Sequence, residues 1–351
     1  MGGIVVVGGL AGGLIATASA APNSPTAGAA AAGGQSSATS CPVSPVADAV
    51  LPSVVTISAS GSGGAGTGSG EVIRSDGYIL TNNHVIAIAA DGGRVEVLFA
   101  NGTSAPATIV GRDTLTDLAV LKVDGQDNLK PITFGTSSSV RVGEPVIALG
   151  APLGLSGSVT SGIVSALDRT VEVPAEGNKN ALLVSAVQTD AAINPGNSGG
   201  ALVSCSGDLV GVPTAGATVP GESGGSSGGS IGLGFAIPVD AAKTISDEII
   251  ATGQVTHAYF GLQTVPIPEA AAAQAGLSTG LYVAGTPAGG PARQAGIRPG
   301  DVITTIDGQP ATSNVQLQEL TVTKKPGETV ELGYTRDGSA ATATVTLAKQ
   351  P

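Results

Sequence analysis

One serine in this chain stands in a setting that could make it a nucleophile. Ser198 lies in Asp190-Ala-Ala-Ile-Asn-Pro-Gly-Asn-Ser-Gly-Gly200, where several glycines favour a sharp, exposed turn. A hydroxyl presented by such a turn could attack a carbonyl carbon while neighbouring backbone N–H groups hold the oxyanion. Because many serine–glycine runs are only flexible loops, this chemistry requires a base and an acid elsewhere in the chain.

The candidate base is His84, one of two histidines in the chain. It follows the apolar run Tyr78–Leu80 at the point where a strand-like pattern gives way to polar residues. A serine hydroxyl needs a positioned base, which is usually histidine. The other histidine, His257, lies in a short connector beyond the segment that holds Ser198, and we expect it to be a solvated or packing residue.

The candidate acid is Asp117, which stands at the start of the apolar strand expected over 118–123. A buried carboxylate there could fix the imidazole tautomer and stabilise the imidazolium. Asp113, beside Arg112, is expected to form a solvated surface pair, and Asp190 is expected to brace the nucleophile loop. The resulting order, histidine then aspartate then serine, is that of chymotrypsin; it differs from the order in α/β-hydrolases and argues against an esterase.

Three motifs together resemble the HtrA (Deg) family of trypsin-like serine proteases, in its bacterial, actinobacterial-like form. They are Thr81-Asn-Asn-His-Val, Thr116-Asp-Leu-Ala-Val and Gly196-Asn-Ser-Gly-Gly. Further matches lie between residues 54 and 77 and over 232–238, so the resemblance covers about residues 45–350. It implies that His84 is the general base, Asp117 its orienting acid and Ser198 the nucleophile, and that no cofactor or metal takes part.

The resemblance also implies where the oxyanion and the substrate side chain bind. The oxyanion hole would be formed by Gly196, Asn197 and Ser198, with the first and last donating backbone N–H groups. The specificity pocket would be lined by four residues: Ala192, Ile193, Thr214 and Ala215. Ala192, six residues before the serine, would lie at the base of the pocket. Since it carries no charge, we expect cleavage after small or medium aliphatic residues and not after Lys or Arg.

Two residues depart from the family pattern. Pro213 occupies a position where the family usually has a backbone N–H donor, and proline has none. We therefore expect one contact near the substrate strand to be lost. Glu71 follows the Gly-Ser-Gly turn at a position that is usually apolar.

The composition indicates a protein built from many short strands. The chain has 351 residues, of which 42% are hydrophobic but only 2% aromatic, with no tryptophan, so the cores must consist of Val, Ile, Leu and Ala. Val- and Thr-rich runs bounded by Gly and Pro favour β-barrels over a parallel α/β sheet. The predicted fold class is mainly β, with two six-stranded chymotrypsin-like β-barrels followed by a PDZ domain of the α+β class.

The chain divides into four predicted segments. Residues 1–21 form a transmembrane anchor or signal segment, 22–46 a disordered Ala/Ser/Pro/Gly linker, 47–253 the protease domain and 255–350 the PDZ domain. Within the protease domain the barrels are predicted over about 47–150 and 151–238, with a closing helix over 239–252. A short entry helix is expected over 46–51. The Gly/Ser-rich segment 220–230 is expected to be a mobile loop beside the specificity pocket.

A four-residue motif marks the predicted peptide site of the PDZ domain. Tyr259-Phe-Gly-Leu262 resembles a carboxylate-binding loop. Backbone N–H groups of Phe260, Gly261 and Leu262 could chelate the carboxylate of a C-terminal peptide, while the adjacent strand pairs with that peptide. Phe260 and Leu262 could equally be core residues.

The N-terminal segment and the charge distribution bear on location and partners. No charged residue occurs before Asp48, and residues 2–21 are continuously small or apolar, about the 20 residues that a membrane span requires. Ala18-Ser-Ala20 also resembles a signal-peptidase site. We favour an anchor slightly, with Met1 not necessarily the natural start; both alternatives place the protein outside the cytoplasm. The net charge of −11 and the lack of a Lys/Arg cluster argue against nucleic-acid binding.

The two cysteines, Cys41 and Cys205, leave two alternatives open. In an oxidising compartment they could form a disulfide that ties the N-terminal arm to the second barrel; otherwise they are unpaired thiols. Neither has the spacing of a metal ligand.

These observations predict an extracytoplasmic serine endopeptidase. Its substrates would be unfolded or misfolded proteins in envelope quality control, its PDZ domain would capture C-terminal peptides, and the resemblance implies a homotrimer. The alternative is a chaperone-like or scaffold peptide-binding protein in which cleavage is secondary.

Overall fold

The structure is a computed structural model of the chain. It describes residues 41–126, 128–151, 157–174, 176, 180–220, 226–275 and 278–351. The predicted N-terminal anchor or signal segment and most of the predicted linker therefore lie outside the described residues. Of the helices that are described, none has the length and apolar character needed to cross a membrane.

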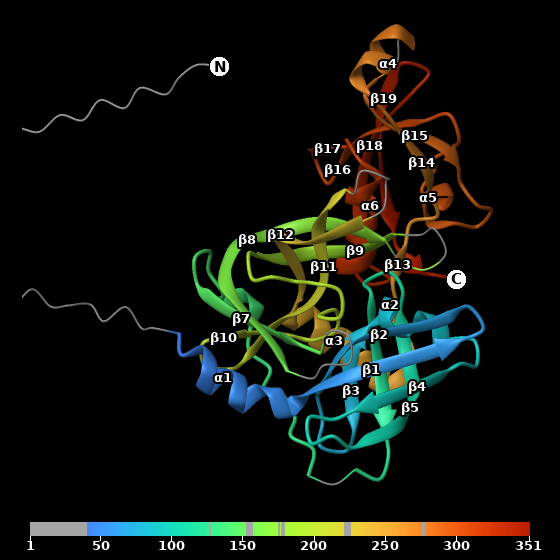
Figure 1. The fold of residues 1–351 in the computed structure, drawn as a ribbon. Coiled ribbons are helices and arrows are strands. Elements are labelled where there is room, and N and C mark those ends of the chain that lie inside the picture. Colours follow the sequence, from blue (N-terminus) through green and yellow to red (C-terminus); the bar gives the residue numbers. More distant parts are fainter. Residues whose placement is uncertain are drawn as a thin grey trace, which may run out of the picture. The chain divides into compact units, whose positions relative to one another are not determined.

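Two closed antiparallel barrels of six strands each are present in the described part of the chain (Figure 1). The first barrel, blue to teal in the figure, has the order β1-β2-β3-β6-β5-β4. Its strands are β1 Val54–Gly61, β2 Gly64–Val72, β3 Tyr78–Asn82, β4 Arg94–Leu98, β5 Ser104–Asp113 and β6 Leu118–Val123. The second barrel has the order β10-β11-β12-β9-β8-β7. Its strands are β7 Pro145–Gly150, β8 Ser158–Pro174, β9 Asn180–Thr189, β10 Ala201–Ser204, β11 Leu209–Pro220 and β12 Ser226–Pro238. The prediction of two six-stranded barrels is confirmed.

Strand β6 shows how the sequence pattern builds the cores. Its residues alternate between two faces, as a strand requires. Ala119 and Leu121 belong to the apolar cluster inside the first barrel. Leu118 and Val120 belong to the cluster that includes residues of both barrels and of two helices. The strand is therefore apolar on both faces, and a continuous run of Leu, Ala and Val fits it.

Helix α1 (Val43–Val50) precedes the first barrel and is followed by the 3-10 turn η1 (Leu51–Ser53). It begins three residues earlier than predicted, so the linker prediction is wrong over 43–46. A proline in its first turn is tolerated because N–H groups there have no intrahelical acceptor. Apolar side chains of α1 pack into the core shared with the second barrel, and a disulfide joins Cys41 to Cys205 in the β10–β11 turn.

Helix α3 (Val239–Thr252) covers the residues predicted for the closing helix. Its buried side chains include Ala242, Ile245 and Ile249, and it ends at Gly253 in the left-handed conformation. The remaining helical pieces of the protease domain are short: α2 Asn83–Ile86, η2 Ala87–Ala89 and η3 Ser137–Ser139.

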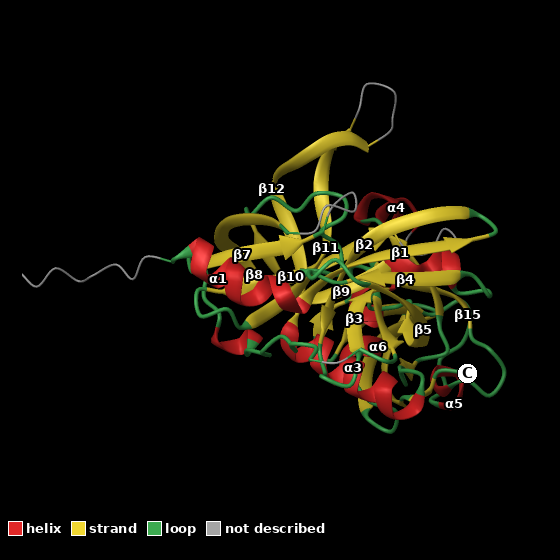
Figure 2. Cartoon of the chain, turned by 60° about the horizontal axis from the view of Figure 1, so that its bottom comes forward, coloured by secondary structure: helices red, strands yellow, loops and turns green. Residues whose placement is uncertain are grey.

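Strands β11 and β12 extend farther than the Gly/Ser-rich sequence predicted. Pairing continues to Thr218 opposite Ser230 and to Pro220 opposite Ser226, so the expectation of an irregular segment over 220–230 is wrong for its second half. Figure 2 shows these strands as long arms that leave the barrel. The pairing supplies each backbone with hydrogen-bond partners, which offsets the entropy that glycine loses on ordering. Residues 221–225 lie outside the described residues.

The C-terminal part has the α+β architecture of a PDZ domain. Within the described residues it has a sheet of order β14-β15-β16-β18-β19, with β17 paired to β16, and a separate β13–β20 pair. The strands are β13 Ala258–Tyr259, β14 Gln263–Ile267, β15 Gly280–Gly285, β16 Val302–Ile306, β17 Gln309–Pro310, β18 Thr329–Arg336, β19 Ser339–Thr346 and β20 Ala348–Lys349. The helices are α4 Glu269–Ala275, α5 Pro291–Gln294 and α6 Asn314–Thr323. Ser313 and Gln316 form a capping box at the start of α6, as the residue types favour.

Candidate active site

His84 and Asp117 form a hydrogen-bonded pair in the first barrel. His84 lies in α2, directly after β3, and Asp117 lies directly before β6, the strand that pairs with β3. The imidazole Nδ1 is 2.8 Å from Asp117 Oδ2, and the backbone N–H of His84 donates to Oδ1 at 2.9 Å. The carboxylate is fully buried, whereas the imidazole is 36% exposed. The ring is thus oriented by a carboxylate while it stays open to a substrate.

Asp117 is held on all sides. Its backbone has φ 59°, a left-handed conformation that costs a non-glycine residue about 1 kcal/mol or more. Its carbonyl accepts hydrogen bonds from the backbone of Asn83 at 3.1 Å and from Asn82 Nδ2 at 2.9 Å. Thr214 of the second barrel donates its hydroxyl to Oδ2. The sequence placed Thr214 in the specificity pocket but did not reveal this contact, because it joins residues on different barrels.

Ser198 lies half-buried in the turn before β10 and is hydrogen-bonded to both barrels. Its carbonyl accepts from the N–H of Ser69 in β2 at 2.9 Å. Its hydroxyl donates to the carbonyl oxygen of Thr214 at 3.3 Å. Among the hydrogen bonds of the described residues, none joins the hydroxyl of Ser198 to His84.

The residues before the serine leave two backbone donors free. Gly196 has φ 100°, which favours glycine at this position. Asn197 donates its N–H to the carbonyl of Asn194 at 2.9 Å, whereas no acceptor among the described residues pairs with the N–H of Gly196 or Ser198. Free, adjacent N–H groups are what an oxyanion requires.

Ser69 supports the same turn from the first barrel, a role that no sequence motif predicted. Its hydroxyl donates to the carbonyl of Gly196 at 2.6 Å and accepts from the N–H of Ala151 at 2.7 Å. The only sequence signal is the Gly-Ser-Gly triplet over 68–70, which could not reveal partners so far along the chain.

The residues predicted to line the specificity pocket lie beside the serine turn. The carbonyl of Ala192 accepts from Asn197 Nδ2 at 3.2 Å and from Thr160 Oγ1 at 3.0 Å. Ile193 is buried against Gly234, where an added Cβ would lie 2.5 Å from Ile193 Cγ1. A methyl group added at Gly234 would therefore collide with Ile193. Ala215 lies in β11 opposite Phe235.

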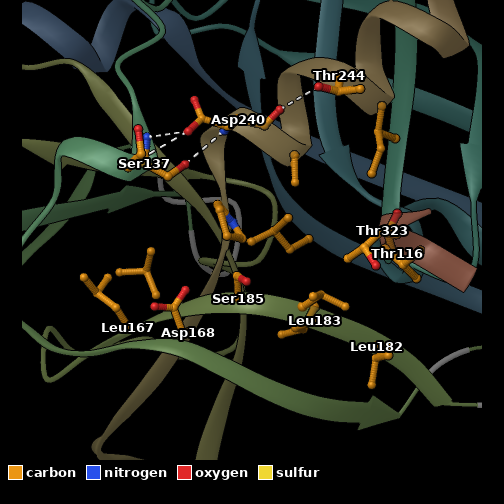
Figure 3. A pocket seen from close by; sticks show the side chains of 18 of the residues that line it. Thr116, Ser137, Leu167, Asp168, Leu182, Leu183, Ser185, Asp240, Thr244 and Thr323 are labelled. Carbon is orange, nitrogen blue, oxygen red and sulfur yellow. Dashed lines mark hydrogen bonds between the residues drawn. The ribbon is translucent and has the colours of Figure 1, made fainter. Parts of the chain in front are cut away.

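Two cavities lie near these residues. One of about 320 Å³ borders His84, Asp117 and Thr214 and is closed on its other side by Val173, Pro174 and Glu176, with Ala87 beside them. Arg112 Nη1 pairs with Glu176 at 2.6 Å and also donates to Asn83, the neighbour of His84, at 3.3 Å. A larger cavity of about 690 Å³ lies between β8–β9 and the start of α3 (Figure 3). Neither His84 nor Ser198 lines it.

Asp113 is not the solvated group that we predicted, and of the two alternatives for His257 the packing residue is the one that fits. Asp113 is buried, and it accepts from Leu115 N–H, Thr116 Oγ1 and the ring of His257, which is itself buried. The predicted Arg112–Asp113 pair is wrong because consecutive strand residues point to opposite faces. Asp190 accepts from the N–H of Ile163 at 2.7 Å and so fixes the start of the serine segment to β8.

The two departures from the family pattern have different outcomes. Pro213 still contributes its carbonyl, which accepts from the N–H of Gly199 at 2.9 Å, and the β11–β12 register shifts directly after it.

Glu71 is completely buried, and neither carboxyl oxygen has a hydrogen-bond partner among the described residues. Desolvation by burial raises the pKa of Glu71 well above its ordinary value of 4.5.

The predicted carboxylate-binding loop lies between β13 and β14. Phe260 is buried in the PDZ core, Leu262 packs against that core, and Gly261 has φ 67°. The carbonyl of Phe260 accepts from the N–H of Ala292 at 2.9 Å. No described residue accepts a hydrogen bond from the N–H groups of Phe260, Gly261 or Leu262.

The fold and the site define a trypsin-like serine protease with a C-terminal PDZ domain. Family models agree: residues 68–212 match the trypsin-like peptidase domain and residues 258–347 match the PDZ domain. The serine protease PepD of Mycobacterium tuberculosis is 44% identical over 349 residues, covering 97% of this chain and 71% of that relative. A probable periplasmic serine endoprotease, DegP-like, of Rhizobium meliloti is 39% identical and covers 81% of this chain. The solved HtrA-type protease AlgW with a decapeptide matches with a TM-score of 0.67 at 33% identity, covering 87% of this chain and 98% of that one.

The chain belongs to the HtrA (DegP) family of serine proteases. It spans about half the length of the DegP-like relatives that it matches. The resemblance expected from the triad motifs is therefore confirmed at the level of the family.

Proposed function

We propose that Ser198 is the nucleophile of a serine endopeptidase, with His84 as its general base and Asp117 as the acid that orients the imidazole. The observation that carries this proposal is the buried Asp117 carboxylate on His84 Nδ1, 2.8 Å away. That bond fixes the tautomer that leaves Nε2 free to accept a proton. The serine lies on the neighbouring barrel, whose Thr214 contacts both Asp117 and Ser198.

The reaction follows from these positions. The hydroxyl of Ser198 leaves the carbonyl of Thr214 and gives its proton to His84 Nε2 as its oxygen bonds to the peptide carbonyl carbon. The N–H groups of Gly196 and Ser198 stabilise the oxyanion, since neither has another acceptor among the described residues. His84 then returns the proton to the leaving amine, and water releases the acyl group by the same route.

The proposed substrates are unfolded proteins cut after small or medium aliphatic residues. Ala192 and Ile193 support this specificity, because neither offers a carboxylate that could pair with a Lys or Arg side chain of the substrate. Cleavage by a site at a barrel junction requires an extended substrate segment, which unfolded chains supply readily. A peptide-library profile dominated by basic residues at the cleaved bond contradicts this specificity.

For the PDZ domain we propose capture of C-terminal peptides at residues 259–262. Three successive backbone N–H groups without acceptors among the described residues support a carboxylate site. AlgW, similar in fold and sequence, was solved with a decapeptide and with a tripeptide.

The proposed setting is protein quality control outside the cytoplasm. The DegP-like relatives are described as periplasmic, and the disulfide between Cys41 and Cys205 is of a kind that persists in oxidising compartments. Anchoring by residues 1–21 and assembly into a homotrimer are part of this proposal and rest on the sequence and the family.

Digestion of unfolded casein tests the proposed function. Wild type should degrade casein, whereas Ser198→Ala should lose at least about a thousandfold in rate. A protein that acts mainly by binding would protect casein from aggregation equally well in both forms and digest it in neither. Equal residual digestion by both forms overturns the serine mechanism.

A further inference from the structure

A buried ion pair joins the start of the PDZ segment to the first barrel. His257 Nε2 lies 2.8 Å from Asp113 Oδ2, although the two residues are separated by 144 positions in the chain. Their side chains are only 10% and 5% exposed. Neither residue takes part in the proposed chemistry, yet both are buried ionisable groups.

Asp113 organises the turn that carries the catalytic aspartate. Its carboxylate accepts from the backbone N–H of Leu115 at 3.1 Å and from Thr116 Oγ1 at 2.5 Å. The turn ends at Asp117, whose φ of 59° lies in the left-handed region that non-glycine residues adopt infrequently. The hydrogen bonds to Asp113 stabilise the turn in this conformation.

The other side of His257 is held by the PDZ domain. The carbonyl of His257 accepts from the N–H of Gln350 at 3.0 Å, and the backbone of Thr321 in α6 contributes to the raised pKa of the His257 ring. Thr116 of the turn and Thr323 at the end of α6 line the same cavity (Figure 3). His257 is therefore bonded through its side chain to Asp113 at the start of the turn and through its backbone to the C-terminal end of the PDZ domain.

Two carboxylates face His257: Asp113 at the end of β5 and Glu248 in α3. Glu248 also accepts from the backbone N–H of Thr256, the residue before the histidine, at 2.9 Å. Burial by itself lowers the pKa of His257, but the hydrogen bond and charge of Asp113, the charge of Glu248 and the backbone of Thr321 outweigh it and raise the pKa above 6.5. A protonated His257 is thus stabilised by its surroundings.

We propose that His257 is a positioning residue for the triad, which holds Asp113 and thereby fixes the turn that presents Asp117 to His84. The protonated imidazole makes a charge-assisted hydrogen bond to Asp113, which is stronger than the bond from the neutral ring. The contribution is fully present below the pKa of the unfolded chain and is lost as the pH rises through the raised pKa of the folded state. The proposal rests on the catalytic roles proposed above for the triad.

The experiment compares full-length wild type with His257→Gln and His257→Arg in peptide cleavage between about pH 6 and pH 9. Glutamine keeps a neutral donor, whereas arginine keeps the charge at every pH. Comparing the ratio of the rates at each pH removes any pH dependence that the three proteins share. The ratio of kcat for wild type over His257→Gln should be about tenfold at the acidic end, with KM nearly unchanged, and should fall toward one at the alkaline end.

Three further comparisons separate the proposed positioning role of His257 from a purely structural role. The Arg variant should retain activity relative to Gln at alkaline pH, and Asp113→Asn combined with His257→Gln should lose no more than either alone. Gln254→Ala, an exposed neighbour in the same connector, should match wild type throughout.

A ratio for His257→Gln that does not change with pH, while wild type still reacts with a fluorophosphonate at Ser198, overturns the role of His257. Failure of wild type to react at Ser198 overturns the proposed triad instead.

Discussion

Glu71 should cost the protein stability at neutral pH, and its replacement by leucine should raise the free energy of unfolding. The residue lies in β2, opposite Val54 of β1 and Leu80 of β3. Burial leaves both carboxyl oxygens without partners, and Thr56 Oγ1, on the same face of the sheet, is likewise unpaired in the described structure. The perturbation removes a buried polar group and replaces it with an apolar one of similar size.

Two contributions determine how much Glu71→Leu should raise the free energy of unfolding. A buried polar group without partners costs about 1–3 kcal/mol, which leucine recovers at every pH. The second contribution is ionisation: because the folded pKa is raised above 4.5, the folded protein keeps a proton that the unfolded chain releases. The free energy of unfolding of the wild type therefore falls by about 1.4 kcal/mol per pH unit between the two pKa values and is constant above the folded one. The first contribution alone gives leucine a gain of about 1–3 kcal/mol, and the ionisation of the wild type adds to this gain as the pH rises above 4.5.

Urea unfolding followed by circular dichroism at several pH values between about 4.5 and 8 measures both contributions. Glu71→Gln is the matched control, since it keeps the unpaired polar group and removes only the ionisation. Its advantage over wild type should grow with pH, whereas Glu71→Leu should add a pH-independent increment above it. A leucine variant less stable than wild type at neutral pH would show that Glu71 has a stabilising partner, and the reasoning would be wrong.

Three further outcomes follow from the same structure. Thr214→Val should lower kcat by about tenfold with little change in KM, because it removes a hydrogen bond to Asp117, and Thr214→Ser should restore most of it. Replacing Cys41 and Cys205 by serine should lower the free energy of unfolding by about 2–4 kcal/mol, measured by denaturant unfolding without reductant; an unchanged midpoint would show that the bond contributes nothing. Gly234→Ala should reduce cleavage after valine more than after alanine in a peptide series, since the added methyl group narrows the pocket; equal loss on both substrates would argue against its place there.

Local sequence patterns were enough for much of this fold. The helix over 239–252 was predicted to the residue because apolar spacing and Gly253 mark both its face and its end. The strand after Asp117 was predicted because an uninterrupted apolar run of this length suits a strand that is buried on both faces. His84 and Asp117 were paired through motifs that resemble those of the protease family, and the two side chains meet because the bordering strands β3 and β6 are neighbours.

The features that the sequence did not predict depend on contacts between segments that are far apart in the chain. Nothing near Asp113 in the sequence indicates that its partner is His257, and its neighbour Arg112 suggested a different one. Whether Glu71 faces solvent or the core follows from the pleat of β2 and from what packs on it. The outer parts of β11 and β12 form strands despite the low strand propensity of glycine and serine, because cross-strand pairing continues beyond the barrel.

Covalent labelling with a fluorophosphonate tests whether Ser198 is the nucleophile and His84 its base. The proposed triad should give a single adduct, located by peptide mass spectrometry on Ser198, that forms at least about a hundredfold more slowly in His84→Ala and is absent in Ser198→Ala. An adduct on another serine, or labelling of Ser198 at the same rate without His84, would contradict it.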